Sequence, residues 1–121
     1  MTDARFGRES RLTDKSSYDR VFQNARRSRD RFYTVLCRAN GRDEARLGLA
    51  IGRKHCKPAS GRNRLKRIVR ESFRHNRESL GGLDIVVINQ PGARQATNAA
   101  LFDSLDHHWR RCAAARHREK N

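Results

Sequence analysis

The stretch from residue 61 to 89, GRNRLKRIVRESFRHNRESLGGLDIVVIN, carries the strongest structural signal in this chain. An α-helix advances by about 100° per residue, and at that pitch the first part of the stretch gathers its core-type side chains on one stripe. The stripe consists of Leu65, Ile68, Val69, Ser72 and Phe73. Gly81 and Gly82 predict the end of this helix, and the Ile- and Val-rich segment Leu83–Asn89 predicts a strand with apolar residues on both faces. We therefore predict a helix over about 61–79, followed by a central strand.

Two strands are predicted before this helix, over Phe32–Ala39 and Arg46–Gly52. Successive side chains of a strand point to opposite faces of the sheet. In the first strand, one face holds Tyr33, Val35 and Cys37, and the other holds Phe32, Thr34, Leu36 and Arg38. In the second strand, Leu47, Leu49 and Ile51 alternate with Gly48, Ala50 and Gly52. We expect the large residues to face the core and the small ones to leave a shallow surface that another backbone could approach closely.

A further helix is expected towards each end of the chain. The first begins near Thr13, whose hydroxyl can cap the free amides of the first turn. Its apolar and aromatic residues at helical spacing are Tyr18, Val21, Phe22 and Ala25. The basic segment 26–31, RRSRDR, then predicts a loop. Asn98 or Thr97 is expected to cap the last helix, whose apolar stripe comprises Leu101, Leu105, Trp109 and Cys112.

The predicted order is helix, strand, strand, helix, strand, helix. It indicates an α+β fold, a two-layer sandwich in which helices pack on a small mixed sheet. The 121 residues suit a single domain. The charged segments 1–10 and 115–121 are expected to be flexible.

The charge of the chain limits the classes of partner. Lysine and arginine total 28 against 13 acidic residues, which gives a formal net charge of +15. Such self-repulsion favours a polyanionic partner, with nucleic acid first and an anionic membrane second. No apolar run approaches the roughly 20 residues of a membrane span, and the first residues, MTDAR, lack the apolar stretch of a signal peptide. We therefore expect a cytoplasmic protein with no membrane partner.

The helix over 61–79 presents cations around most of its remaining circumference. Arg62, Lys66, Arg70 and Arg74 form a row at a spacing of four residues, while Arg64 and Arg67 lie further round. Like charges at this spacing destabilise an isolated helix by a few tenths of a kcal/mol per pair. One interpretation is a merely solvated basic face, but such a face usually mixes signs of charge. The other is a phosphate-binding face, whose two flanks could contact two polyanionic surfaces at once.

Residues for independent chemistry are sparse. Cys37, Cys56 and Cys112 are odd in number and have no C-x-x-C spacing, so we expect reduced thiols, some of them buried, and neither a disulfide framework nor a zinc site. His107 and His108 are adjacent and point about 100° apart on a helix, so they cannot chelate one ion together. The sequence names no catalytic residue and no dedicated metal ligand.

The segment Gly61–Glu71 resembles the signature of the bacterial ribonuclease P protein family, R-N-R-x-K-R-x-x-R, and matches it at every fixed position through Arg70. The strand Leu47–Ile51 with the basic pair Arg53 and Lys54 resembles what precedes the signature in that family. The segment Trp109–Arg111 resembles part of the family's last helix. The resemblance covers about residues 8 to 115.

This resemblance implies a fold, a partner and an activity. The fold would contain a left-handed βαβ crossover, although such connections are right-handed in about 98% of cases. The partner would be a large catalytic RNA, and together they would remove the 5′ leader of precursor tRNA. The RNA would perform the hydrolysis with Mg²⁺, and the protein would need neither a cofactor of its own nor a protein partner.

The resemblance also implies roles for individual residues. Those expected to contact the catalytic RNA are Arg62, Asn63, Arg64 and Arg67, with Arg53 and Lys54 of the preceding loop. Those expected to line a cleft for the leader are Tyr18 and Phe22 of the first helix, Phe32, Thr34 and Leu36 of the sheet, and Lys66 and Arg70. Aromatic platforms in a cationic groove are how proteins bind single-stranded RNA, although each aromatic residue could instead be plain core. Two alternative functions are a structural RNA-binding protein or RNA chaperone, and an independent nuclease.

Overall fold

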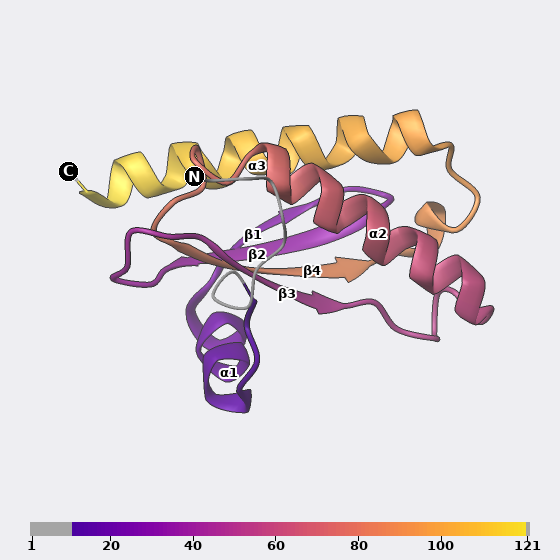
Figure 1. The fold of residues 1–121 in the computed structure, drawn as a ribbon, viewed down its shortest axis with the longest axis horizontal. Coiled ribbons are helices and arrows are strands. Elements are labelled where there is room, and N and C mark those ends of the chain that lie inside the picture. Colours follow the sequence, from indigo (N-terminus) through magenta and orange to yellow (C-terminus); the bar gives the residue numbers. More distant parts are fainter. Residues whose placement is uncertain (1–10, 121) are drawn as a thin grey trace.

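The computed structural model describes the backbone of residues 11–120 and the side chains of residues 11–116 (Figure 1). Its elements, in chain order, are α1 (Lys15–Asn24), β1 (Arg26–Arg29), β2 (Tyr33–Ala39), β3 (Arg46–Ala50), α2 (Ala59–His75), β4 (Leu83–Asn89), the 3₁₀ turn η2 (Pro91–Ala93) and α3 (Asn98–Lys120). None of the helices in this described part has the length and hydropathy of a membrane span. The α+β class and the mixed sheet are as predicted.

The four strands form one sheet in the order β1-β2-β4-β3. β2 is antiparallel to both β1 and β4, while β3 and β4 run parallel. A parallel pair needs a crossover connection, which α2 provides between β3 and β4. β4 therefore lies inside the sheet, which agrees with its apolar residues on both faces.

Helices cover both faces of this sheet: α2 and α3 lie on one, and α1 on the other (Figure 1). The larger core lies under α2 and α3 and includes Tyr33, Val35 and Cys37 of β2, as their alternation predicts. Trp109 of α3 joins the two helices, because its Nε1 donates to Ser72 Oγ at 2.8 Å and its ring meets Phe73 edge-on. A smaller core lies under α1 and consists of Leu12, Val21, Leu36 and Val86.

β1 corrects the loop predicted over residues 26–31. Residues 26–29 pair with β2, with Arg27 opposite Leu36 and Arg29 opposite Thr34. β1 is an edge strand in which only Ser28 is buried. Its charged side chains therefore face solvent, as is common at sheet edges. The sequence of residues 26–29 does not indicate a strand by itself, because their strand conformation depends on hydrogen bonds to β2.

Several predicted boundaries were also wrong. Asp14, not Thr13, caps α1: its Oδ2 accepts from the Ser17 amide at 3.0 Å, and hydrogen bonds from Ser16 and Ser17 lower its pKa to about 2. α2 ends at His75 rather than Ser79, and turns lead from there to Gly82, whose φ of +87° suits glycine. At α3 the prediction is confirmed, because Thr97 caps the helix: its Oγ1 accepts from the Ala100 amide at 3.1 Å. α3 continues to Lys120. Residues 1–10 and 121 lie outside the described residues.

A buried polar network that the sequence did not reveal fastens α3 to β1. His108 is fully buried; Ser28 Oγ lies 2.6 Å from its Nδ1, and Asp30 Oδ2 lies 3.1 Å from its Nε2. Asp30 also accepts from Ser104 Oγ and from the amides of Phe32 and Tyr33. Burial lowers the pKa of His108, although the Asp30 carboxylate opposes that shift. Burial alone would raise the pKa of Asp30, but these hydrogen bonds bring it below its ordinary value.

This network predicts a loss of stability in mild acid. The pKa of His108 is lower in the folded state than in the unfolded state, so the unfolded state binds more protons as the pH falls through about 6.5. The melting temperature should therefore fall from pH 7.5 to pH 5.5, and His108→Gln should flatten that dependence. Asp30 titrates below this window. His107, the exposed neighbour of His108, offers a matched control. If His107→Gln changed the pH dependence of the melting temperature as much as His108→Gln, the assignment of that dependence to His108 would be refuted.

Candidate nucleic-acid interface

α2 buries the predicted stripe and turns its cations outward. The buried residues of the helix are Leu65, Ile68, Val69, Ser72 and Phe73, as predicted. Asn63, Arg67 and Arg70 are exposed, while Arg62, Arg64 and Lys66 are half-buried. No acidic residue lies in the first turn, so the positive end of the helix dipole adds to these charges. This basic face, defined as residues 62–64, 66, 67 and 70, therefore offers a cationic surface to a polyanion.

Arg62 and Arg64 use part of their guanidinium groups to hold neighbouring segments. Arg64 Nε donates to Asn98 Oδ1 at 2.9 Å, and its Nη2 donates to the Ala96 carbonyl, so the side chain joins α2 to the start of α3. Arg62 Nη1 donates to the Cys56 carbonyl at 3.1 Å and to the Lys57 carbonyl. A substitution at either position would therefore disturb local structure as well as any RNA contact.

The loop before α2 places two further cations beside the basic face. Arg53 and Lys54 are both exposed in this loop. Its start is fixed by Asn89, a buried residue whose amide exchanges hydrogen bonds with the backbone of Gly52 at 2.8 and 3.1 Å. Its end is held by the Arg62 contacts. The loop thus carries Arg53 and Lys54 between two anchored points.

On the opposite face of the sheet, α1 presents two aromatic side chains. Tyr18 is half-buried over β3: a Cβ atom at Gly48 would lie 2.7 Å from its ring. The close approach expected at Gly48 therefore comes from a tyrosine ring and not from another backbone. Phe22 is 50% exposed, whereas the other large hydrophobic residues that the structure describes are buried or half-buried. An exposed ring beside a half-buried one gives bases a surface on which to stack.

The predicted sheet residues of this face are only partly accessible. Leu36 is buried in the smaller core, and Thr34 is buried with its Oγ1 accepting from Gln90 Nε2 at 2.7 Å. Phe32 precedes β2, and its half-buried side chain packs against the larger core. The prediction that Phe32 shares a face with Thr34 and Leu36 was therefore wrong, because Phe32 lies outside the strand whose alternation placed it there.

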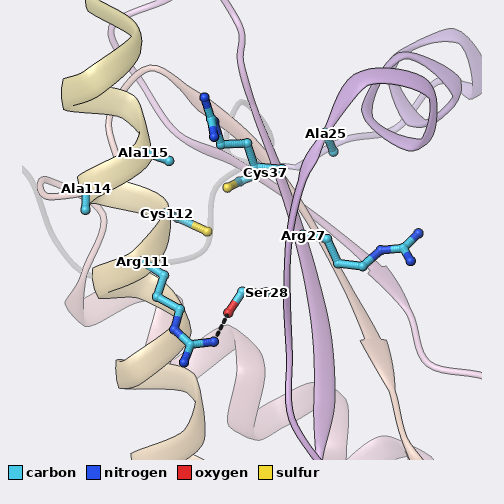
Figure 2. Close-up of a pocket in the computed structure, with 9 residues that line it drawn as sticks. Ala25, Arg27, Ser28, Cys37, Arg111, Cys112, Ala114 and Ala115 are labelled. Carbon is cyan, nitrogen blue, oxygen red and sulfur yellow. Dashed lines mark hydrogen bonds between the residues drawn. The ribbon is translucent and has the colours of Figure 1, made fainter.

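Two cations of this face were missed by the sequence analysis. Arg27 and Arg29 lie opposite Leu36 and Thr34 in the ladder, and directly opposed residues project from the same face of a sheet. In Figure 2, Arg27 points away from α3, as this register requires. Both side chains are exposed. The pairing of β1 with β2 was the signal needed to find them.

The flank of α2 that carries Lys66 lies away from α3. Arg64 contacts the start of α3, and Lys66, two residues later, projects about 160° away from it around the helix. Arg70 follows Lys66 by one turn. α3 contacts β1 and β2, so this flank lies on the side of β3, at the other edge of the sheet. Lys66 and Arg70 therefore lie where the α2 layer meets the sheet edge.

Among the described residues, no three His, Cys, Asp or Glu side chains lie close enough together to hold a metal ion.

Comparisons with known proteins agree on one family. Residues 6–113 match the family model described as "Ribonuclease P". The ribonuclease P protein component of Photobacterium profundum is 44% identical over 111 residues, which are 92% of this chain and 94% of that protein, and that of Vibrio campbellii is 42% identical with the same coverage. Among solved structures, the RNase P protein of Thermotoga maritima matches with a TM-score of 0.75 and 32% identity, over 84% of this chain and 96% of that one. The Staphylococcus aureus protein has a TM-score of 0.75 and 27% identity, over 81% of this chain and 90% of that one.

Proposed function

Because this chain belongs to the ribonuclease P protein family, we propose that its basic face binds the catalytic RNA of that enzyme and that the α1 side of its sheet binds the 5′ leader of precursor tRNA. The chain is the protein subunit of an endoribonuclease of tRNA processing. The proposal divides the surface of the protein into two RNA-facing regions.

The observation that carries this proposal is the one-sided build of α2. One stripe of the helix is completely buried, and cations occupy most of the remaining circumference, with Arg67 and Arg70 exposed. Concentrated positive charge binds phosphate through Coulomb attraction and through release of the counterions that surround RNA. Asn63, Arg67 and the loop residues Arg53 and Lys54 are the proposed contacts to the catalytic RNA, while Arg62 and Arg64 contribute their remaining donors and hold the surface in shape.

The proposed leader surface combines rings with flanking cations. Tyr18 and Phe22 supply stacking surfaces, each worth about 1–3 kcal/mol per stacked base. Lys66 and Arg70, on the flank of α2 towards the β3 edge, are proposed to supply its charge. Leu36 belongs to the smaller core against which Tyr18 packs, and Thr34 is buried in the same strand. Phe32 is left out because it packs against the larger core.

The chemistry of cleavage is proposed to belong to the RNA. Cleavage of a phosphodiester by water needs metal ions or a positioned acid and base. We propose that Mg²⁺ serves the holoenzyme through RNA ligands, and that the protein contributes by neutralising phosphate repulsion between the catalytic RNA and its substrate. That role predicts a larger benefit from the protein at low Mg²⁺ than at high Mg²⁺.

Reconstitution tests the proposed function. Purified protein alone should leave a 5′-labelled precursor tRNA uncut, whereas protein with its cognate catalytic RNA should release the leader at Mg²⁺ concentrations where the RNA alone is slow. Raising the Mg²⁺ concentration should reduce the difference in cleavage rate between the RNA alone and the RNA with protein, because the ion then screens the same phosphates. A catalytic RNA that gains nothing from the protein would contradict the proposal, and crosslinking that recovers mainly ribosomal RNA would favour a structural RNA-binding protein.

A further inference from the structure

A solvent-open pocket of about 540 Å³ lies between α3 and the strands β1 and β2 (Figure 2). It is on the α3 side of the sheet, away from the proposed leader surface. Its lining includes two thiols, Cys37 of β2 and Cys112 of α3, together with Ser28, Arg26 and Arg111. The family signature does not include any of these residues, and the proposed RNA contacts do not use them.

The two thiols meet although they are far apart in the sequence. Cys37 is 4% exposed and Cys112 is 1% exposed, and both are unoxidised. Their side chains are hydrogen-bonded to each other, and Figure 2 shows the two sulfur atoms pointing into the space between strand and helix. The hydrogen bond to Cys37, together with burial, raises the pKa of Cys112. At neutral pH Cys112 is therefore held as a thiol.

The pocket changes what such a pair can do. A buried thiol without a partner behaves as a small, inert hydrophobe. Here the second sulfur is already in contact, the pocket gives a small reagent access, and the guanidinium groups of Arg26 and Arg111 line the same space. The thiolate is the form that reacts.

We propose that Cys37 and Cys112 are a site of reversible oxidation, at which a hydroperoxide joins β2 to α3 through a disulfide. The thiolate of one cysteine attacks the peroxide oxygen, which breaks the O–O bond and gives a sulfenic acid and hydroxide. The sulfur of the second cysteine then displaces the sulfenic oxygen as water, which forms the S–S bond. Two thiols lose two electrons and two protons in all, and one hydrogen peroxide becomes two waters.

Cys56 provides a matched control within the same chain. It is 1% exposed, as buried as Cys112, but its sulfur contacts the Pro58 carbonyl at 3.9 Å and does not line this pocket. If burial alone governed oxidation, Cys56 and Cys112 would respond alike. If the contact between two thiols governs it, only Cys37 and Cys112 should form the disulfide.

The experiment treats the native full-length protein with hydrogen peroxide, denatures it, alkylates the remaining thiols and measures the intact mass and the linked peptides. After oxidation the wild type should take up one alkyl group instead of three, and Cys56→Ala none instead of two. Both should yield one Cys37–Cys112 peptide, and a dithiol reductant should reverse both changes. Cys37→Ser and Cys112→Ser should not form an intramolecular disulfide. The rate should increase from pH 7 to pH 9 as the thiolate fraction grows.

Two outcomes would overturn this proposal. One is a native protein that keeps three alkylatable thiols although the urea-unfolded chain is oxidised under the same conditions. The second is a disulfide that includes Cys56. None of these measurements involves RNA, so their failure leaves the proposed function standing.

Discussion

Replacing Asp84 with alanine is expected to destabilise the protein by about 3–5 kcal/mol, because it strands a largely buried guanidinium without its counter-charge. Asp84 is 7% exposed in the interior strand β4. Arg46 Nε and Nη2 donate to its two carboxylate oxygens at 2.8 and 2.7 Å, and Asn40 Nδ2 donates to Oδ1 at 2.9 Å. The paired geometry ties β3 and the turn after β2 to β4. Urea unfolding followed by circular dichroism would measure the loss.

Two further variants separate burial from charge. Asp19 pairs with Lys15 at 3.1 Å, but their side chains are 49% and 90% exposed, so Asp19→Ala should cost at most about 1 kcal/mol. Replacing both Arg46 and Asp84 with apolar residues should recover much of the loss, since no unpaired charge then remains inside. An Asp84→Ala variant as stable as Asp19→Ala would show that water still solvates Arg46 in the folded protein.

The parts of the fold that the sequence predicted are those whose signal is local. The stripe of α2 and the alternation of β2 depend on side-chain periodicity within one element, and both are buried as predicted. β1 could not be found in this way, because its pairing with β2 is what makes it a strand and its arginines resemble a loop. The same limit hid the network of Ser28, Asp30 and His108, whose members come from separate elements.

The candidate site shows this limit for individual cations. The sequence places Arg62, Arg64 and Arg67 together on the outer part of one helix and cannot distinguish among them. The structure does, because Arg64 reaches Asn98 and Ala96 across the space between α2 and α3, and Arg62 closes the preceding loop. Arg67 is the exposed member of the three. Substitution of Arg67 therefore tests RNA contact with the least disturbance of the fold.

Removing cations from the two flanks of α2 is expected to produce two different binding defects. Arg67→Ala should weaken binding of the catalytic RNA, while Lys66→Ala with Arg70→Ala should weaken binding of precursor tRNA that carries a leader and leave mature tRNA unaffected. Arg64→Ala should resemble Arg67→Ala but add a loss of thermal stability, because it also releases the start of α3. Each lost phosphate contact should reduce the slope of log K against log salt by about 0.7–0.9.

Fluorescence binding titrations over a range of salt concentrations, with the catalytic RNA and with holoenzyme plus leader-bearing or mature tRNA, would measure these defects. Arg42→Ala removes one charge, as Arg67→Ala does and as each substitution of the Lys66 and Arg70 pair does, from the exposed turn after β2. It should change neither binding step by a comparable amount per charge. This control matters because the chain carries a net charge of +15, so any lost cation weakens RNA binding slightly through the long-range field. Equal losses at both steps from the Arg67 variant and the Lys66 and Arg70 variant would mean that α2 acts as one undivided cationic surface, and the two-flank model would then fail.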